Sequence, residues 1–153
     1  MQKIVILDNI RSAHNVGSIF RTADGAGVSK IYLVGYTPTP RDRFGRVSPE
    51  ISKTSLGATE TVGWEHIDNE AVPVLLTRLR SEGFQIVAIE QTPRSIFLQD
   101  FVLPEKVVYV FGNEIDGVST AFLEAVDTVV EIPMHGSKES LNVSVTAGIV
   151  LFK

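Results

Sequence analysis

Three clusters of polar residues and glycines stand out in the sequence, and their residue types restrict the chemistry available to each. The second of them, "FGNEIDGVS" (111–119), contains Glu114 and Asp116, two negative charges that would repel a phosphate group. This cluster is therefore a poor candidate for a phosphate-binding loop, although its glycines allow a tight turn. The three clusters are "NIRSAHNVGSIFRTADGAGV" (9–28), "FGNEIDGVS" (111–119) and "IPMHGSKESLNVSV" (132–145).

The first cluster has the pattern of a capped amphipathic helix. Its apolar residues recur at positions 16, 19, 20 and 23, the spacing of one helix face. Ser12 or Asn15 can cap this helix, and Gly17 lets another segment approach its first turn closely. Asn15 and Arg21 lie off the apolar stripe.

The third cluster consists of a strand end, a turn at Gly136 and the head of a final helix. Ser140 has the position expected of the residue that caps this helix. Asn142 follows two residues later. If Ser140 caps the helix, the presence of a second polar residue at Asn142 is still unexplained.

Several common chemistries are excluded. The chain has no cysteine, which removes disulfides, thiolate metal sites and cysteine nucleophiles. Its three histidines lack metal-ligand spacing, so we expect no metal. The sequence also contains no GxGxxG after a strand, no GxxxxGK[ST] and no GxSxG, which are typical of dinucleotide-binding proteins, P-loop proteins and α/β-hydrolases.

Short apolar strands alternate with helical patterns along the chain. This alternation predicts an α/β fold with a mostly parallel sheet and helices on both faces, in a single domain spanning residues 1–153. Residues 36–57 and 92–104 are expected to be loops, the latter with one helical turn. Strands are expected at 3–8, 30–35, 84–91, 106–111 and 127–133. Helices are expected around 16–23, where Gly25 and Gly27 end the first one, and at 70–82, 119–125 and 141–153.

In parallel sheets, ligands bind at the carboxyl ends of the strands. We therefore expect the loops 89–95, 112–118 and 133–140 to come together as one site. The second and third polar clusters contribute to this site.

Charge is distributed unevenly, within a net charge of −4. Residues 1–57 carry eight Lys or Arg against four acids, and residues 58–153 carry six against fourteen. The basic part can meet a polyanion despite the net charge, because distant charges are screened. The alternative is a chance cluster on a solvated face.

The last helix, 141–153, is apolar around almost its whole circumference. Such a helix must be covered on all sides. We expect a homodimer that buries it, with burial inside the monomer as the alternative. No apolar run is long enough for a membrane span and no signal peptide is recognisable, so a cytoplasmic protein is expected.

The three clusters together, in this order and at this spacing, resemble the sequence motifs of the SpoU–TrmH family of RNA ribose methyltransferases, within the SPOUT superfamily. The resemblance runs from Asn9 to Phe152. It implies a dimeric α/β protein with a deep trefoil knot near the C-terminus, S-adenosylmethionine as cofactor and RNA as partner. The reaction would be attack by a ribose 2′-hydroxyl on the sulfonium methyl group.

The resemblance also implies site residues. Those around the reacting ribose would be Asn15, Arg21, Glu114, Ser140 and Asn142. Those that contact the cofactor, largely through the backbone, would be Ile89, Glu90, Gly112, Asn113, Ile132, Met134 and Leu141. Those that hold the RNA phosphates would be Arg11, Arg41, Arg43, Arg46 and Lys53, most of them in the loop 36–57.

Arg21 has the most demanding role in this hypothesis. The family is thought to use it as a base, but an arginine keeps its proton at physiological pH. We expect Arg21 to clamp the 2′-oxygen and a neighbouring phosphate, across the dimer from its own cofactor. Glu114 is expected to fix either Arg21 or the loop geometry, and Asp116 to be a surface or turn residue.

Single-domain relatives most often act on transfer RNA, so tRNA is expected before rRNA. Ala26 stands where the family commonly has Phe, which affects packing but removes no chemical group. Two alternatives are a catalytically silent RNA-binding or assembly factor, and a methyltransferase that acts on proteins or small molecules. The presence of Arg21 and Asn142 argues against the first, and the basic loop argues against the second.

Overall fold

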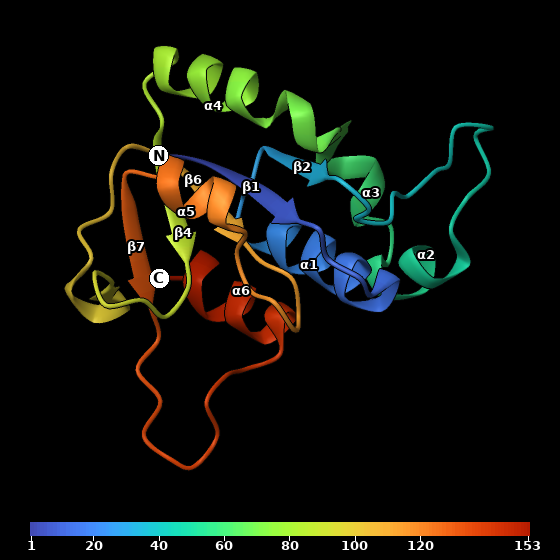
Figure 1. Cartoon of the computed structure of the whole chain (residues 1–153). Helices are drawn as coiled ribbons and strands as arrows, with labels where there is room; N and C mark the ends of the chain where they lie inside the picture. The colour runs from blue at the N-terminus through green and yellow to red at the C-terminus, as the bar shows by residue number, and fades with distance from the viewer.

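A computed structural model describes all 153 residues and shows one seven-stranded sheet in which every pair of neighbouring strands is parallel (Figure 1). The α/β prediction with a parallel sheet is confirmed. The strand order is β3-β2-β1-β6-β4-β7-β5. The strands are β1 (Gln2–Asp8), β2 (Lys30–Val34), β3 (Gly63–Ile67), β4 (Gln85–Ile89), β5 (Ile96–Phe97), β6 (Lys106–Phe111) and β7 (Thr128–Glu131).

The central strands read as continuous apolar runs because both faces of the sheet are covered. In β1 the residues from Val5 to Leu7 are fully buried, and so are Val107 to Val110 in β6. Edge strand β3 is mostly exposed, and its sequence "GWEHI" has no buried face. The analysis of apolar patterns missed β3 for this reason.

Helices cover both faces, as predicted. The larger core cluster lies under α1, α2, α3 and α6, and the second lies under α4 and α5 (Figure 1). None of the helices combines the length and apolar composition needed to cross a bilayer. The helices are α1 (Ala13–Gly25), α2 (Pro49–Ser55), α3 (Ala58–Thr61), α4 (Val72–Ser81), α5 (Thr120–Ala125) and α6 (Val143–Leu151), with short 3₁₀ turns η1 (Asn69–Ala71) and η2 (Leu98–Asp100).

The segment 36–57 is not one long loop, and that prediction was wrong for its second half. Ser48 accepts a hydrogen bond from the Ile51 backbone N–H at 3.4 Å, and Pro49 occupies the first turn of α2. Serine followed by proline is a recognised start signal for a helix. The first half of the segment 36–57 forms a hairpin closed by an antiparallel bridge between Arg41 and Val47.

Gly17 allows α2 to pack closely on α1, which confirms the expected close approach at that glycine. A Cβ atom at Gly17 would lie 2.7 Å from the Ile51 carbonyl oxygen of α2. The Thr54 hydroxyl completes the contact by donating to the His14 carbonyl at 3.2 Å. This contact fixes α2, and with it the basic segment 36–57, beside the first turn of α1.

The final helix is buried on one face only. Val143, Ala147, Val150 and Leu151 lie in the core, whereas Val145 is 50% exposed. Burial of the whole helix inside the monomer is therefore wrong. Apolar residues on its exposed side are Val145, Ile149 and Phe152.

Candidate functional site

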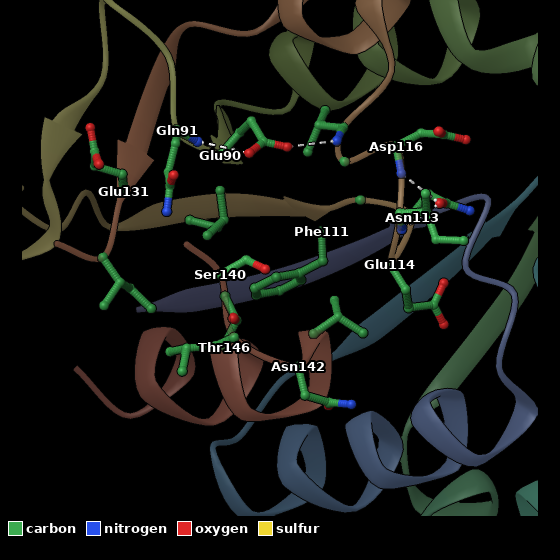
Figure 2. A pocket seen from close by; sticks show the side chains of 18 of the residues that line it. Glu90, Gln91, Phe111, Asn113, Glu114, Asp116, Glu131, Ser140, Asn142 and Thr146 are labelled. Atoms are coloured by element: carbon green, nitrogen blue, oxygen red, sulfur yellow. Dashed lines mark hydrogen bonds between the residues drawn. The ribbon is translucent and has the colours of Figure 1, made fainter. Parts of the chain in front are cut away.

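A cavity of about 660 Å³ lies at the carboxyl ends of β4, β6 and β7, beside the first turn of α6 (Figure 2). The loops after these three strands border it, as the sequence predicts. Polar and apolar residues line it both along the loop 112–118 and at the head of α6. The side chains labelled in Figure 2 are Glu90, Gln91, Phe111, Asn113, Glu114, Asp116, Glu131, Ser140, Asn142 and Thr146.

The loop 112–118 folds back on itself, and its two glycines permit this. A Cβ at Gly112 would lie 2.2 Å from the Val118 nitrogen, which no side chain can tolerate. Gly117 has φ of +72°, in the left-handed region. Asn113 and Gly117 exchange two backbone hydrogen bonds, at 3.0 and 2.9 Å. The loop is thus a closed turn whose backbone forms a wall of the cavity.

The Asn113 side chain stabilises this turn from within. It is buried, and its amide oxygen accepts the Ile115 and Asp116 backbone N–H groups, each at 2.8 Å. Its amide nitrogen donates to the Asn9 carbonyl at 2.9 Å and to the Tyr36 hydroxyl at 2.7 Å. The Asn113 side chain is therefore fully used in holding the turn in place.

Glu90 joins the end of β4 to the same loop. Its carboxylate accepts the Gln91 N–H at 2.8 Å and the Val118 N–H at 3.0 Å (Figure 2). A Cβ at Gly117 would collide with this carboxylate, at 2.1 Å from Oε2. A side chain at position 117 would therefore displace the Glu90 carboxylate, and the positive φ favours glycine there as well.

Glu114 holds the start of α1. Its carboxylate accepts the Arg11 N–H at 2.8 Å, the Ser12 N–H at 2.9 Å and the Asn15 amide at 3.0 Å. Burial alone would raise the pKa of Glu114, but these hydrogen bonds outweigh it and hold the pKa below its usual range. Of the two contacts expected for Glu114, the structure shows the one with the loop geometry, because its carboxylate bonds to Arg11, Ser12 and Asn15 and not to Arg21.

Asn142, and not Ser140, caps the final helix. Its Oδ1 accepts the Ser144 N–H at 2.9 Å, and its Nδ2 donates to Asn15 Oδ1 at 3.3 Å. The expectation that Ser140 is the cap was wrong by two residues. Ser140 is instead an exposed residue that lines the cavity. Ser12 is the cap of α1, accepting the Asn15 N–H at 3.1 Å.

The hydrogen bonds that join Glu114 to Asn15 and Asn15 to Asn142 connect three segments that are far apart in the sequence. The chain thus brings four of the five residues expected around the ribose to one side of the cavity. Glu114, Ser140 and Asn142 line it, and buried Asn15 lies directly behind. All seven residues expected to contact the cofactor also line the cavity: Ile89, Glu90, Gly112, Asn113, Ile132, Met134 and Leu141.

Arg21 is the one expected residue that the structure leaves outside the cavity. It is exposed on α1, almost two turns beyond Asn15. It takes part in none of the chain's ion pairs. Its guanidinium is available to a partner outside this chain.

The basic residues expected to bind RNA are all exposed. Arg41 and Arg46 also serve the hairpin, since Arg41 donates to the Gly45 carbonyl at 3.0 Å and Arg46 pairs with Asp42 at 2.8 Å. Arg11 follows β1, and Lys53 lies in the last turn of α2. None of them lines the cavity.

The sequence analysis missed several lining residues. Gln91 donates to the Glu139 carbonyl at 2.7 Å, and Thr146 lies one helical turn after Asn142. Thr92 has a buried hydroxyl without a partner. Asp8 lies behind the loop and accepts the Ser119 N–H at 2.7 Å. The i, i+4 spacing from Asn142 is a signal that could have found Thr146, and the position of Asp8 at a strand end could have found that residue.

Comparison with known proteins identifies the group to which this architecture belongs. The model of the SpoU rRNA Methylase family matches residues 2–152. The chain belongs to this family. Two curated relatives are similar over nearly the whole chain: a 23S rRNA (guanosine-2'-O-)-methyltransferase RlmB of Neisseria meningitidis, 37% identical, and a tRNA (guanosine(18)-2'-O)-methyltransferase of Aquifex aeolicus, 35% identical.

Solved structures agree. The AdoMet-bound rRNA methyltransferase from Sinorhizobium meliloti has 30% identity and a TM-score of 0.86, covering 99% of this chain and 54% of that one. The A. aeolicus TrmH/SpoU tRNA modifying enzyme has 33% identity and a TM-score of 0.82, covering 98% and 72%. The match to the Neisseria relative covers 97% of this chain and 56% of that protein. The match to the Aquifex relative covers 98% of this chain and 67% of that protein. It thus spans little more than half the length of the first of these curated relatives.

Proposed function

We propose that this chain is an S-adenosylmethionine-dependent methyltransferase acting on a ribose 2′-hydroxyl of RNA. The observation that carries the proposal is the cavity, where the seven residues expected to contact the cofactor lie together with Glu114, Ser140 and Asn142. Family membership supports the proposal, since both curated relatives are named as RNA 2′-O-methyltransferases. A solved relative carries AdoMet.

The cavity fits this cofactor in size and chemistry. Its volume of about 660 Å³ is within the range of sites for drug-sized ligands. The backbone of Gly112, which takes no part in the hydrogen bonds between Asn113 and Gly117, offers a donor and an acceptor, and Ile132 and Leu141 supply an apolar surface for an adenine ring. When bound, S-adenosylmethionine supplies an electrophilic methyl group attached to a positively charged sulfur. The carboxylates around the cavity are compatible with that charge.

The chain's own residues then have distinct tasks. Glu90 and Asn113 hold the loop 112–118 in shape, so that its backbone is preorganised for the cofactor. Glu114 and Asn15 fix the position of Asn142 at the head of α6. Ser140, which has no hydrogen bond to another residue's side chain, is available to the ribose. The amide of Asn142 orients the nucleotide beside it.

Arg21 is proposed to act in the cavity of a second protomer. Its exposure and its lack of an ion pair leave it free for this, and the exposed side of α6 supplies an apolar contact surface. A homodimer through α6 would cover Val145, Ile149 and Phe152. Arg21 would then hold the 2′-oxygen and a phosphate of the RNA, with the proton passing to phosphate or water.

A C-terminal trefoil knot is part of the proposal. It is supported by the position of β4 between β6 and β7, two strands that follow it in the chain. Lys3 ties the end of the last helix back to β1, by a hydrogen bond of 2.8 Å to the Leu151 carbonyl. A knotted chain should refold far more slowly from a denaturant-unfolded state than an unknotted one of its size.

The RNA class is proposed as tRNA before rRNA, and the location as cytoplasmic. Relatives named for both RNA classes support RNA in general and do not favour one class. The test is incubation with methyl-labelled S-adenosylmethionine and separate tRNA and rRNA fractions. Label in tRNA supports the whole proposal, and label in rRNA alone overturns the choice of tRNA. Donor binding without label in either fraction favours the alternative, a silent RNA-binding or assembly factor.

A further inference from the structure

We propose that Phe44, at the tip of the hairpin 39–47, is a stacking platform for an unpaired base of the RNA. The inference rests on the proposed RNA substrate and assigns it a contact outside the cavity. Phe44 is 67% exposed, far more than an aromatic ring that serves a core. A single exposed apolar residue is common on proteins, so the surroundings of the ring must carry the argument.

Two guanidinium groups lie against the Phe44 ring. The Arg43 guanidinium carbon is 4.8 Å from the ring centroid, and that of Arg46 is 5.0 Å away. Both distances are within the range of a cation–π contact. An aromatic ring flanked by arginines combines a surface for bases with charges for phosphates, which is the combination used by proteins that bind single strands.

The two arginines are held differently. Arg46 is fixed by Asp42, whose Oδ2 accepts its Nε at 2.8 Å. Arg43 has the ring as its contact and takes part in none of the chain's ion pairs. Arg43 can therefore leave the ring for a phosphate and expose a ring face to a base. Arg46 stays in place and keeps a positive charge beside the platform.

The hairpin is built to hold Phe44 outward. Asp42 Oδ1 accepts the backbone N–H groups of Phe44 at 2.8 Å and of Arg46 at 3.0 Å. Gly45 has φ of +78° and its N–H donates to the Asp42 carbonyl at 2.9 Å. Ordering this tip on the RNA therefore costs little entropy, because it is folded beforehand.

The segment also begins beside a residue that lines the cavity. Tyr36 is 60% exposed, and its hydroxyl accepts the Asn113 amide at 2.7 Å. Asn113 lines the cavity, so a single run of chain connects the reaction site to Phe44. An RNA strand that enters the cavity at one nucleotide can thus meet Phe44 with another.

The first test reads stacking directly. Phe44→Trp and Val74→Trp each add an indole at an exposed position, Val74 being 73% exposed on α4 over the opposite face of the sheet. Both variants keep Trp64 as a common background. Addition of a short single-stranded oligoadenylate, without donor, should quench the indole at position 44 and leave that at position 74 unchanged. Polyphosphate, which has charge but no bases, should quench neither.

The second test measures the substrate. Phe44→Leu keeps an apolar side chain without a π face, and Phe44→Tyr keeps the face. We expect KM for the labelled RNA fraction to rise about tenfold in Phe44→Leu, with donor affinity and kcat unchanged, and to stay near wild type in Phe44→Tyr. Equal quenching by polyphosphate, absence of quenching, or equal KM in the two variants would overturn the inference. Failure of methyl transfer in the wild type is a separate outcome, because the fluorescence test contains no donor.

Discussion

In two loops of this protein a carboxylate accepts hydrogen bonds from backbone N–H groups, but the groups it joins differ in their separation along the chain. In the hairpin 39–47, Asp42 accepts backbone N–H groups from residues two and four positions away. In the loop 112–118, Glu114 accepts N–H groups from residues more than 100 positions away. The hydrogen bonds hold the pKa of both carboxyl groups below the usual range; for Asp42 the main cause is the Arg46 backbone N–H.

The difference lies in what each loop needs in order to exist. The hairpin is folded by its own residues, so it can change without affecting the rest of the chain. The loop 112–118 depends on β4, on β1 and on the start of α1. The proposed cofactor site is therefore made from long-range contacts, and the proposed RNA-binding hairpin is made from local ones.

The largest effect that would test this contrast is expected at Gly112. Gly112→Ala places a Cβ 2.2 Å from backbone of the same loop, so the cavity wall must shift. We expect donor affinity, measured by calorimetry, to fall about 100-fold or more, as for a misplaced binding group. Gly136→Ala is the matched control, because a Cβ there meets nothing within 4 Å and Gly136 lies outside the cavity. Equal affinity in the two variants would contradict a rigid, preformed wall.

The next largest effect is expected at Arg21, which is exposed on α1 outside the cavity. Arg21→Ala should lower kcat about 100-fold with unchanged donor affinity, since this side chain lies outside the cavity. Arg21→Lys keeps the charge but loses the planar fork, and should recover only part of the rate. A full rate with lysine at an unshifted pH profile would contradict the clamp. Wild-type rate in Arg21→Ala would remove Arg21 from the mechanism.

A smaller effect, on the free energy of unfolding, should distinguish Glu114 from Asp42. Glu114→Gln should lower the free energy of unfolding by about 1–2 kcal/mol at neutral pH, because it weakens hydrogen bonds to a charged group. The pKa of Glu114 is lowered by folding, so its contribution is complete above the unfolded-state pKa and is lost as the pH falls through the folded one. Denaturant unfolding at several pH values should show a flatter acid dependence in Glu114→Gln.

Two controls belong to this prediction. Asp116→Asn changes a neighbouring exposed carboxylate whose side chain accepts no hydrogen bond, and should leave stability unchanged. Asp42→Asn alters only the hairpin, so global unfolding should stay at the wild-type value. If Asp42→Asn destabilises the chain as much as Glu114→Gln, the distinction between local and long-range loops is wrong.

The sequence predicted what depends on local pattern. Buried strands such as 106–111 and the helix whose apolar face includes residues 16–23 follow from apolar spacing, and the meeting of three loops follows from the parallel sheet. Strand β3 escaped because an exposed edge strand has no apolar face. Ser140 was taken as a cap because serine and asparagine both fit that position, and only the hydrogen bond from the Ser144 N–H distinguishes them.

Most of the candidate site residues line one cavity, but the sequence did not show how they are held there. Resemblance to a family supplied the residues, and the structure shows how they depend on one another. The close contact of Glu90 with Gly117, and the hydrogen bonds that Glu114 accepts from Arg11 and Ser12, join segments that are distant in sequence. No spacing along the chain encodes such a pair.

The central claim is methyl transfer to a ribose 2′-oxygen, and the position of the methyl group on the RNA tests it most directly. Alkali cleaves RNA through the free 2′-hydroxyl, so a 2′-O-methyl group protects the adjacent phosphodiester bond. RNA labelled by the wild-type protein should yield its label in alkali-resistant dinucleotides, and Gly112→Ala should yield none. Label recovered in mononucleotides would place the methyl group on a base and contradict the account.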